Sequence, residues 1–371
     1  MSLPNVSVFK YLSQDPSVNI TQPQPKASAR ANTMRIPNSR FCCQAAFLFL
    51  LFFNIPTALA QHGDPITEWA TGVGFGSQLH LNIVYQRVNS VELKLDVITA
   101  GSPFSPKPVV IFFHGGGWVQ GSKDNHLLKL MPYLARGMDG VNVEYRLASQ
   151  AEAPAAVEDC RCALHWVIQH AKEYGFDPDK IVVTGESAGG HLALMTGMLT
   201  PADGFDNSCD LPPEQWAGHG GPREIKVAAI VNFFGVTDVA DFLQPSNPSN
   251  FVIRWLGSPS RIELAKRLSP ITYVRKDSPP IITVHGDKDT IVPYEQAVRL
   301  HDALNRAGAQ NQLITVQGGG HGPYVTFPWT AEQNWNAYQS VFEFLEKAGV
   351  LQKNEAPSSK GSKNESADSG K

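Results

Sequence analysis

The sequence has no run rich in lysine or arginine, and its formal net charge is only -3 over 371 residues. Binding to nucleic acid needs clustered positive charge that neutralises phosphates, so this composition argues against a nucleic-acid partner. Charged residues make up 18% of the chain and hydrophobic residues 42%, the balance of an ordinary globular protein. We therefore expect a folded globular protein that is neither disordered nor membrane-spanning as a whole.

The chain also lacks an apolar run long enough to span a bilayer comfortably. A short apolar run at residues 47–53 follows a basic stretch at 34–40 and precedes the small residues Ala58 and Ala60. A basic segment, a short apolar core and small residues in that order are typical of a secretory signal peptide. We expect cleavage after Ala60, a secreted or periplasmic mature protein, and no stable membrane insertion after cleavage. A membrane anchor is the alternative.

Both ends of the chain are poor in apolar residues. Residues 1–33 are polar and rich in proline and serine, and residues 351–371 are mostly serine, lysine, asparagine and glutamate. Such segments cannot bury enough apolar surface to fold, so we expect a disordered extension ahead of the signal peptide and a disordered tail. The sequence thus predicts a signal region over 1–60, a folded domain over 61–350 and a tail over 351–371. Whether Met1 or Met34 is the true start stays open, and N-terminal sequencing of the mature protein would test it.

Cysteine is scarce, with five residues in the chain. Cys42 and Cys43 lie in the predicted signal peptide. Cys160 and Cys162 lie two positions apart on a predicted helix and point to different faces. In an oxidising compartment one of them can pair with Cys209, which leaves the other buried and free. There is no Cys-x-x-Cys pattern, so the sequence predicts no metal site.

From about residue 80 onward, strand patterns alternate with helix patterns. Residues 91–97 alternate apolar and polar, as a half-buried strand near the edge of a sheet does. Continuous apolar runs predict strands buried on both faces, as in a parallel sheet covered by helices, at 109–113, 181–183, 227–231, 281–284 and 313–316. Helical patterns cover 155–174, 192–199, 294–307 and 335–348. This alternation predicts an α/β fold with a mostly parallel, doubly wound sheet.

Two stretches depart from the alternation of strands and helices. Residues 201–223 and 239–268 are rich in proline, glycine, serine and asparagine. Long insertions after strands usually carry binding loops and lids. We therefore expect short lid insertions there.

The strongest chemical signal is Gly185-Glu186-Ser187-Ala188-Gly189, between a predicted strand and a predicted helix. A serine on such a sharp turn has an exposed hydroxyl, and small neighbours prevent clashes. The sequence predicts Ser187 as a nucleophile. The alternative is a glycine-rich junction with a serine that caps the helix.

A serine hydroxyl needs a base to take its proton and an acid to orient that base. In folds with a Gly-x-Ser-x-Gly turn, the acid and then the histidine follow the serine along the chain. Only His301 and His321 satisfy this order. His301 lies in a helical pattern, where a surface or groove position is expected, whereas His321 lies in a glycine loop after a strand. Asp289, and less favourably Asp287, ends the preceding strand, so we predict the triad Ser187, Asp289 and His321.

A third element, His114-Gly115-Gly116-Gly117-Trp118, directly follows a buried strand. Unobstructed N–H groups of Gly116 and Gly117, together with that of Ala188, are candidates for the oxyanion hole that holds developing negative charge. Trp118 and Glu186 are candidate substrate-binding residues. We expect His114 and His191 to brace loops and Asp159 to bind nearby backbone, while Trp118, Trp216 and Trp255 either line a pocket or fill the core.

Together these residues resemble the esterase/lipase branch of the α/β-hydrolases that includes enzymes like hormone-sensitive lipase. The matching segments are 114–118, 144–148, 153–166, 185–195, 285–293 and 318–322. The sequence is most similar to bacterial bifunctional feruloyl and acetylxylan esterases, through 255–257, 269–274 and 278–280. The likeness spans about residues 85 to 347. It implies an α/β-hydrolase fold, a serine esterase activity, and no metal or organic cofactor.

Two departures from this pattern bear on the substrate. Only about thirty residues separate the predicted signal peptide from the first predicted strand, too few for a substantial N-terminal helical cap, and Ser149-Gln150 stands where the group usually has Pro-Glu. Both favour an open site suited to short acyl or feruloyl esters of large alcohols, such as an acylated polysaccharide. The alternatives are an exopeptidase or arylformamidase on the same fold, or an inactive hydrolase-like binding module. The sequence does not fix the oligomeric state.

Overall fold

The computed structural model describes residues 76–100, 105–209 and 225–353. The predicted signal peptide, the extension before it and nearly all of the predicted tail lie outside the described residues, as does Trp216. The domain boundary at residue 60 and the lack of an N-terminal helical cap therefore stay predictions.

The described chain forms an eight-stranded sheet in the order β1-β2-β4-β3-β5-β6-β7-β8. The strands are β1 (Ser77–Val88), β2 (Val91–Ala100), β3 (Lys107–Phe113), β4 (Asp139–Val143), β5 (Phe176–Glu186), β6 (Ala229–Phe233), β7 (Ile281–Gly286) and β8 (Asn311–Val316). β2 is antiparallel to both of its neighbours, and every other pair of neighbouring strands is parallel. The predicted mostly parallel α/β sheet is confirmed.

Two strands escaped prediction from the sequence. β1 has a largely exposed first half, so its polar and apolar residues give no clean pattern. β4 has the sequence Asp-Gly-Val-Asn-Val, in which only two residues are strongly apolar, yet all five are buried. Because β1 occupies the edge of the sheet, β2 lies inside it and is more buried than its alternating sequence indicates. Its charged residue Asp96 is buried as well, paired with Lys123.

Helices occupy the predicted places and also fill the second insertion. They are α2 (Met131–Leu134), α3 (Ala155–Gln169), α4 (Ala171–Tyr174), α5 (Ala188–Met198), α6 (Asn250–Leu256), α7 (Ile262–Arg267), α8 (Glu295–Ala307) and α9 (Ala331–Lys347). The helix predicted over 155–174 is divided at His170. It ends, as predicted, at Gly175, whose positive φ of 76° suits glycine.

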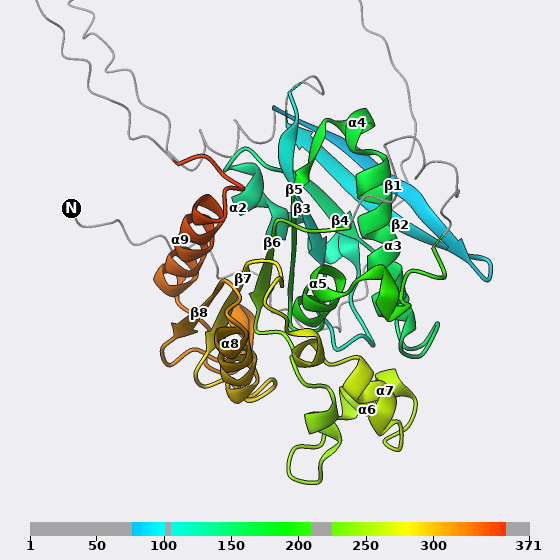
Figure 1. Cartoon of the computed structure of the whole chain (residues 1–371), viewed down its shortest axis with the longest axis vertical. Coiled ribbons are helices and arrows are strands. Elements are labelled where there is room, and N and C mark those ends of the chain that lie inside the picture. Colours follow the sequence, from blue (N-terminus) through cyan, green and yellow to red (C-terminus); the bar gives the residue numbers. More distant parts are fainter. Residues whose placement is uncertain (1–75, 101–104, 210–224, 354–371) are drawn as a thin grey trace, which may run out of the picture. The chain divides into compact units, whose positions relative to one another are not determined.

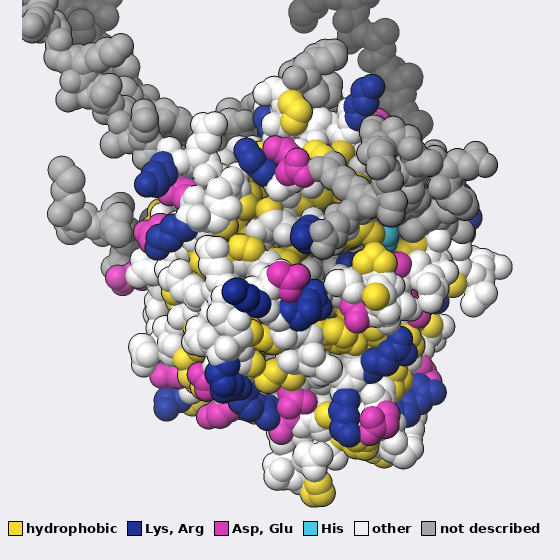
Figure 2. All heavy atoms as spheres, in the orientation of Figure 1, with side chains coloured by type: hydrophobic (Ala, Val, Ile, Leu, Met, Phe, Trp, Pro, Cys, Tyr) yellow, Lys and Arg dark blue, Asp and Glu magenta, His cyan; other side chains and the backbone are white. Residues whose placement is uncertain are grey.

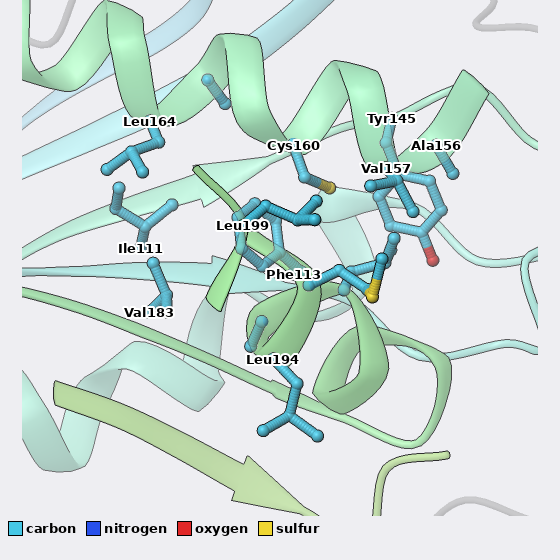
Figure 3. Packing of buried hydrophobic residues seen from close by; sticks show 14 of the residues in the cluster. Ile111, Phe113, Tyr145, Ala156, Val157, Cys160, Leu164, Val183, Leu194 and Leu199 are labelled. Carbon is cyan, nitrogen blue, oxygen red and sulfur yellow. The ribbon is translucent and has the colours of Figure 1, made fainter. Parts of the chain in front are cut away.

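Alternate side chains of each strand pack on opposite faces of the sheet, as the twofold repeat of a strand requires. Val109, Ile111 and Phe113 of β3 join a core cluster with α3, α5 and α8. Val110 and Phe112 join a second cluster with α2 and α9. Figure 1 shows these helices on the two sides of the sheet. Figure 3 shows Cys160 and Leu164 of α3 packed above β3, which carries Ile111 and Phe113.

The stretch after α5 is held to α3 by charge and by a disulfide. Cys162 is bonded to Cys209, and Cys160 is buried and free, which resolves the predicted pairing. Beside the disulfide, the Arg161 guanidinium donates two hydrogen bonds of 2.6 Å to the Asp206 carboxylate. This end of the insertion is therefore fixed to the main body of the fold.

The surface carries charges of both signs side by side. On the face seen in Figure 2, lysine and arginine side chains alternate with aspartate and glutamate, and apolar atoms lie between them. Within the described ranges, no helix has both the length and the apolar character needed to span a membrane.

Candidate active site

Ser187 lies on the sharp turn between β5 and α5. Its φ of 56° and ψ of -118° fall in a region that residues with side chains rarely adopt. The turn closes tightly, because a Cβ placed on Gly189 would lie 2.0 Å from the carbonyl oxygen of Phe113. Glycine at that position thus lets β3 and the first turn of α5 come together beneath the serine.

Three side chains from separate segments meet at this turn. The Ser187 hydroxyl lies 2.8 Å from Nε2 of His321, and Nδ1 of His321 lies 2.7 Å from Oδ2 of Asp289. A carboxylate can only accept, so Nδ1–H donates to Asp289 and Nε2 is left to accept the serine proton. All three residues predicted as the triad are therefore within hydrogen-bonding distance.

The loop after β7 holds Asp289 firmly. Its Oδ1 accepts hydrogen bonds from the N–H groups of Ile291 and Val292, and Nε2 of His285 lies 3.2 Å from Oδ2. Burial alone would raise the pKa of Asp289, but hydrogen bonds from His285 and His321 outweigh burial and hold that pKa well below its ordinary value. Asp289 is thus a fixed anion behind His321. Asp287 instead accepts a hydrogen bond from the N–H of Gly318 and braces the next loop.

The glycine loop after β3 passes directly over the serine. A Cβ on Gly115 would lie 2.9 Å from the carbonyl oxygen of Glu186 and 3.7 Å from Cβ of Ser187. Gly116 has a φ of +119°, which favours glycine. Ala188 opens α5, where N–H groups have no partner within the helix. None of the N–H groups of Gly116, Gly117 and Ala188 donates to a backbone carbonyl in the described chain.

His114 and His191 lie under this loop and outside the cavity. His114 stacks on Tyr145 with ring centroids 4.2 Å apart and bonds to the carbonyl of Gly115, and Nε2 of His191 donates to the carbonyl of Leu268. Burial lowers the pKa of each imidazole to about 4, so both are neutral at pH 7. Both contacts are of the bracing kind that the sequence indicates.

A cavity of about 540 Å³ opens at the serine. Its polar side chains besides Ser187 and His321 are Gln120, His126 and Glu186. Its apolar side chains are Phe234, Phe251, Ile291, Pro323 and Val325. Phe251 projects from α6 toward the glycine loop, since a Cβ on Gly117 would lie 2.9 Å from its ring. The second insertion therefore supplies part of the wall.

Several cavity residues had no distinct signal in the sequence. Phe251 lies on α6 in the second insertion and His126 lies beside two short 3-10 helices, and neither spacing nor motif marks them as cavity residues. Lys129 lies outside the cavity lining and is likewise unmarked in the sequence, and its Nζ forms an ion pair with the carboxylate of Glu186. Glu186 was a candidate from its place beside Ser187, but its partner comes from a segment 57 residues away, and only the fold brings the two together.

Other expectations need correction. Trp118 is only 2% exposed and stacks on the buried Trp255 at 4.2 Å, so it fills the core beneath the cavity instead of binding substrate. His301 is buried, and its Nδ1 bonds to Asn311, which rules out the expected surface position. Asp159 accepts from the backbone N–H of Arg146, as expected, but also pairs with the Arg146 guanidinium. Within the described ranges, no group of three His, Cys, Asp or Glu side chains can hold a metal ion.

Comparison with known families places this geometry in context. Residues 95–304, more than half of the chain, match the model of the family BD-FAE. The chain belongs to this family. The match includes Ser187 and Asp289. A second match, to a family described as TAP-like protein, covers residues 262–348 and includes Asp289 and His321. The membership and the sheet together establish the α/β-hydrolase fold of the esterase/lipase group.

Individual relatives of this BD-FAE family member are esterases by name. The chain is 32% identical to a probable carboxylic ester hydrolase, LipM, of Mycobacterium tuberculosis, over 55% of this chain and 46% of LipM. It is 31% identical to the esterase LipC of the same organism, over 59% of this chain and 54% of LipC. The chain thus spans about half the length of the curated relatives it matches.

The solved structure of a thermophilic esterase, Est2, from the planctomycete Thermogutta terrifontis is also similar. Its propionate-bound form has a TM-score of 0.60 and 28% sequence identity, and the match covers 76% of this chain and 97% of Est2. Est2 has also been solved with butyrate bound and, after reaction with tabun, in a phosphoramylated form.

Proposed function

We propose that this protein is a serine esterase that hydrolyses carboxylic esters through a covalent acyl-enzyme. The observation that carries the proposal is the continuous chain of hydrogen bonds from Asp289 through His321 to Ser187 at the floor of a cavity. The names of the relatives and the family membership support the same activity.

The reaction runs in two steps. His321 takes the proton of Ser187 while the hydroxyl oxygen attacks the ester carbonyl carbon, and the N–H groups of Gly116, Gly117 and Ala188 receive the oxygen that becomes negative. His321 then gives its proton to the leaving alcohol. Water attacks the acyl-enzyme with His321 again as base, which releases the acid. Asp289 stays ionised throughout and stabilises the imidazolium.

For the substrate, we propose short-chain acyl or feruloyl esters, including those on plant polysaccharide. The cavity is open and only moderately large, and its wall of aromatic and aliphatic side chains fits a small apolar or aromatic acyl group. Propionate and butyrate in the structures of Est2 are acyl groups of this size. A secreted or periplasmic location, where such polymers occur, is part of the same proposal.

The test compares the initial rates of the wild type and Ser187→Ala on acetyl, butyryl, octanoyl and feruloyl esters and on acetylated xylan. We expect the wild type to cleave short acyl or feruloyl esters and the variant to lose the activity by a factor on the order of a million. Faster cleavage of N-formyl anilides or aminoacyl amides would point to an arylformamidase or exopeptidase instead. Faster cleavage of octanoyl than acetyl esters would contradict the substrate class.

A further inference from the structure

Glu186 is an acid immediately before the nucleophile, and it lines the same cavity as Ser187 and His321. Its side chain is only 14% exposed. Neither the transfer of the serine proton nor the oxyanion hole uses this carboxylate. A carboxylate that lines the same cavity as the reacting atoms and is largely withdrawn from water nevertheless acts on them, because solvent screens its charge weakly.

The partner of Glu186 is Lys129, in the short 3-10 helix Leu127–Leu130 before α2. The Lys129 side chain is 18% exposed, and its Nζ donates to Oε1 of Glu186. Among the ion pairs of the described residues, this one alone involves Glu186. The nearby Lys123 is engaged elsewhere, since it pairs with Asp96 and Asp124. Lys129 is thus the cation that offsets Glu186.

Other titratable groups around the cavity leave this pairing unchanged. The carboxylate of Asp289 faces His321 and His285, on the other side of the serine. Nδ1 of His126 donates to the carbonyl of Ser122, and the buried hydroxyl of Tyr133 lies 3.3 Å from Thr184. The groups that border Glu186 and His321 are therefore Lys129, His126, Tyr133, Asp289 and His285.

An unpaired carboxylate at this place would oppose the reaction in two ways. It would repel the negative oxygen that develops in the oxyanion hole, because Glu186 lines the same cavity as Gly116 and Gly117. It would also stabilise the imidazolium form of His321 in the free enzyme, and that form cannot accept the serine proton. A neutralised Glu186 avoids both effects.

We infer that Lys129 is a positioning residue for ester hydrolysis: it holds and neutralises Glu186, so that the wall beside Ser187 is polar without net charge. The inference rests on the proposed function, because it assigns a role in that reaction. Lys129 itself does not line the cavity and acts through Glu186.

The test uses Lys129→Met, Lys129→Arg, Glu186→Gln and the double variant that combines Lys129→Met with Glu186→Gln. Lys129→Met removes the positive charge and keeps the carboxylate, so we expect kcat/KM at pH 7 to fall about tenfold and the acid limb of its pH profile to move up by about one unit. Glu186→Gln removes the carboxylate and keeps the positive charge, which moves the acid limb down. The double variant returns the limb toward its wild-type position, and Lys129→Arg keeps it there.

A matched control lies at the other end of the same strand, where Lys180 pairs with Asp177. Lys180→Met also removes a lysine from an ion pair on β5, and we expect it to leave the acid limb in place. NMR titration of the His321 ring protons in each variant reads the same electrostatic effect without substrate. If the protein cleaves no ester, the proposed function fails, and this titration still decides the role of Lys129. Shifts in the same direction for Lys129→Met and Glu186→Gln, or no shift in either, would overturn the inference.

Discussion

Two aspartates in this molecule, the buried Asp289 and the partly buried Asp206, share nearly the same chemistry. Asp289 accepts a hydrogen bond from His321, and Oδ2 of Asp206 lies 3.3 Å from Nε2 of His165. Hydrogen-bond donors hold the pKa of each carboxyl below its ordinary value, although burial opposes this. Asp206, however, faces the guanidinium of Arg161, which is always charged. Asp289 faces His321, which carries a positive charge only when it accepts a proton.

This difference between the two partners separates a stabilising ion pair from a pair that can take part in a reaction. The Arg161–Asp206 ion pair beside the Cys162–Cys209 disulfide holds two segments together, and its arginine stays protonated and cannot transfer a proton. The Asp289–His321 pair ends at a serine hydroxyl and a cavity, so its charge can change during a reaction. A buried acid with a low pKa is therefore not by itself a sign of catalysis, and the group at the far end of the hydrogen-bond chain decides.

The largest effect that separates the two acids is expected from their amides. Asp289→Asn removes the acceptor that orients His321, and we expect kcat for ester hydrolysis to fall about ten-thousandfold with the fold retained. Asp206→Asn should leave kcat of the folded protein near wild type and lower the free energy of unfolding by about 3 kcal/mol, because it strands Arg161. Rates per folded molecule and denaturant unfolding measure both. A loss of kcat in Asp206→Asn like that in Asp289→Asn would remove the distinction.

Removal of the disulfide should have a smaller effect, on the free energy of unfolding and not on the rate of ester hydrolysis. Cys162→Ser with Cys209→Ser opens a link across 47 residues, and we expect the free energy of unfolding to fall by about 2–4 kcal/mol. Neither cysteine lines the cavity, so kcat/KM should stay within about twofold of wild type. Urea unfolding with and without reductant, followed by rates on an acetyl ester, checks this. A large loss of kcat/KM would show that the disulfide also shapes the cavity.

As the pH falls below 7, we expect the first loss in the free energy of unfolding to come from His114 and His191, the two buried histidines near the cavity. The pKa of His114 and that of His191 are lowered to about 4 by burial beneath the glycine loop. Between about pH 6.5 and 4, the unfolded chain binds more protons at these sites than the folded one, so stability falls as the pH falls. We expect each histidine to reduce the free energy of unfolding by about 1–2 kcal/mol at pH 5 relative to pH 7.

The stabilising contribution of the Asp206 ion pair is lost in a lower pH range than that of the histidines. The pKa of Asp206 is lowered in the folded state, so its contribution is complete above the unfolded pKa of about 4 and is lost only as the pH falls further. Unfolding of wild type and His191→Gln at pH 5 and 7 tests the prediction for the histidines. An unchanged pH dependence in His191→Gln would mean that other groups cause the loss of stability.

The sequence was sufficient for the parts of the site that follow chain order and local geometry. Ser187 stands on a turn that needs its glycine neighbours, and Asp289 and His321 stand at the ends of consecutive apolar strands. What it could not supply depends on contacts across the fold. Trp118 follows a glycine loop but turns into the core against Trp255, and no local pattern distinguishes that from a place in the cavity wall.

The same dependence on contacts across the fold explains why β1, β4 and the lysine that pairs with Glu186 were not predicted from the sequence. β4 is buried because it lies between β2 and β3, and its own residues barely show it. The lysine that pairs with Glu186 lies in a short 3-10 helix 57 residues earlier in the sequence, and no periodicity or motif marks it. Topology placed these residues, and a single sequence carries topology only indirectly.

The backbone of Ser187 has a consequence for how this protein can change over evolutionary time. Its φ of 56° and ψ of -118° suit glycine better than serine, and residues held in such regions store about 1–3 kcal/mol of strain. A mutation to glycine would relieve that strain, so selection for folding alone would favour its loss. A homologue that keeps serine at this position has a less stable fold than the same protein with glycine. In a homologue that no longer uses the hydroxyl, replacement of the serine by glycine would raise the free energy of unfolding.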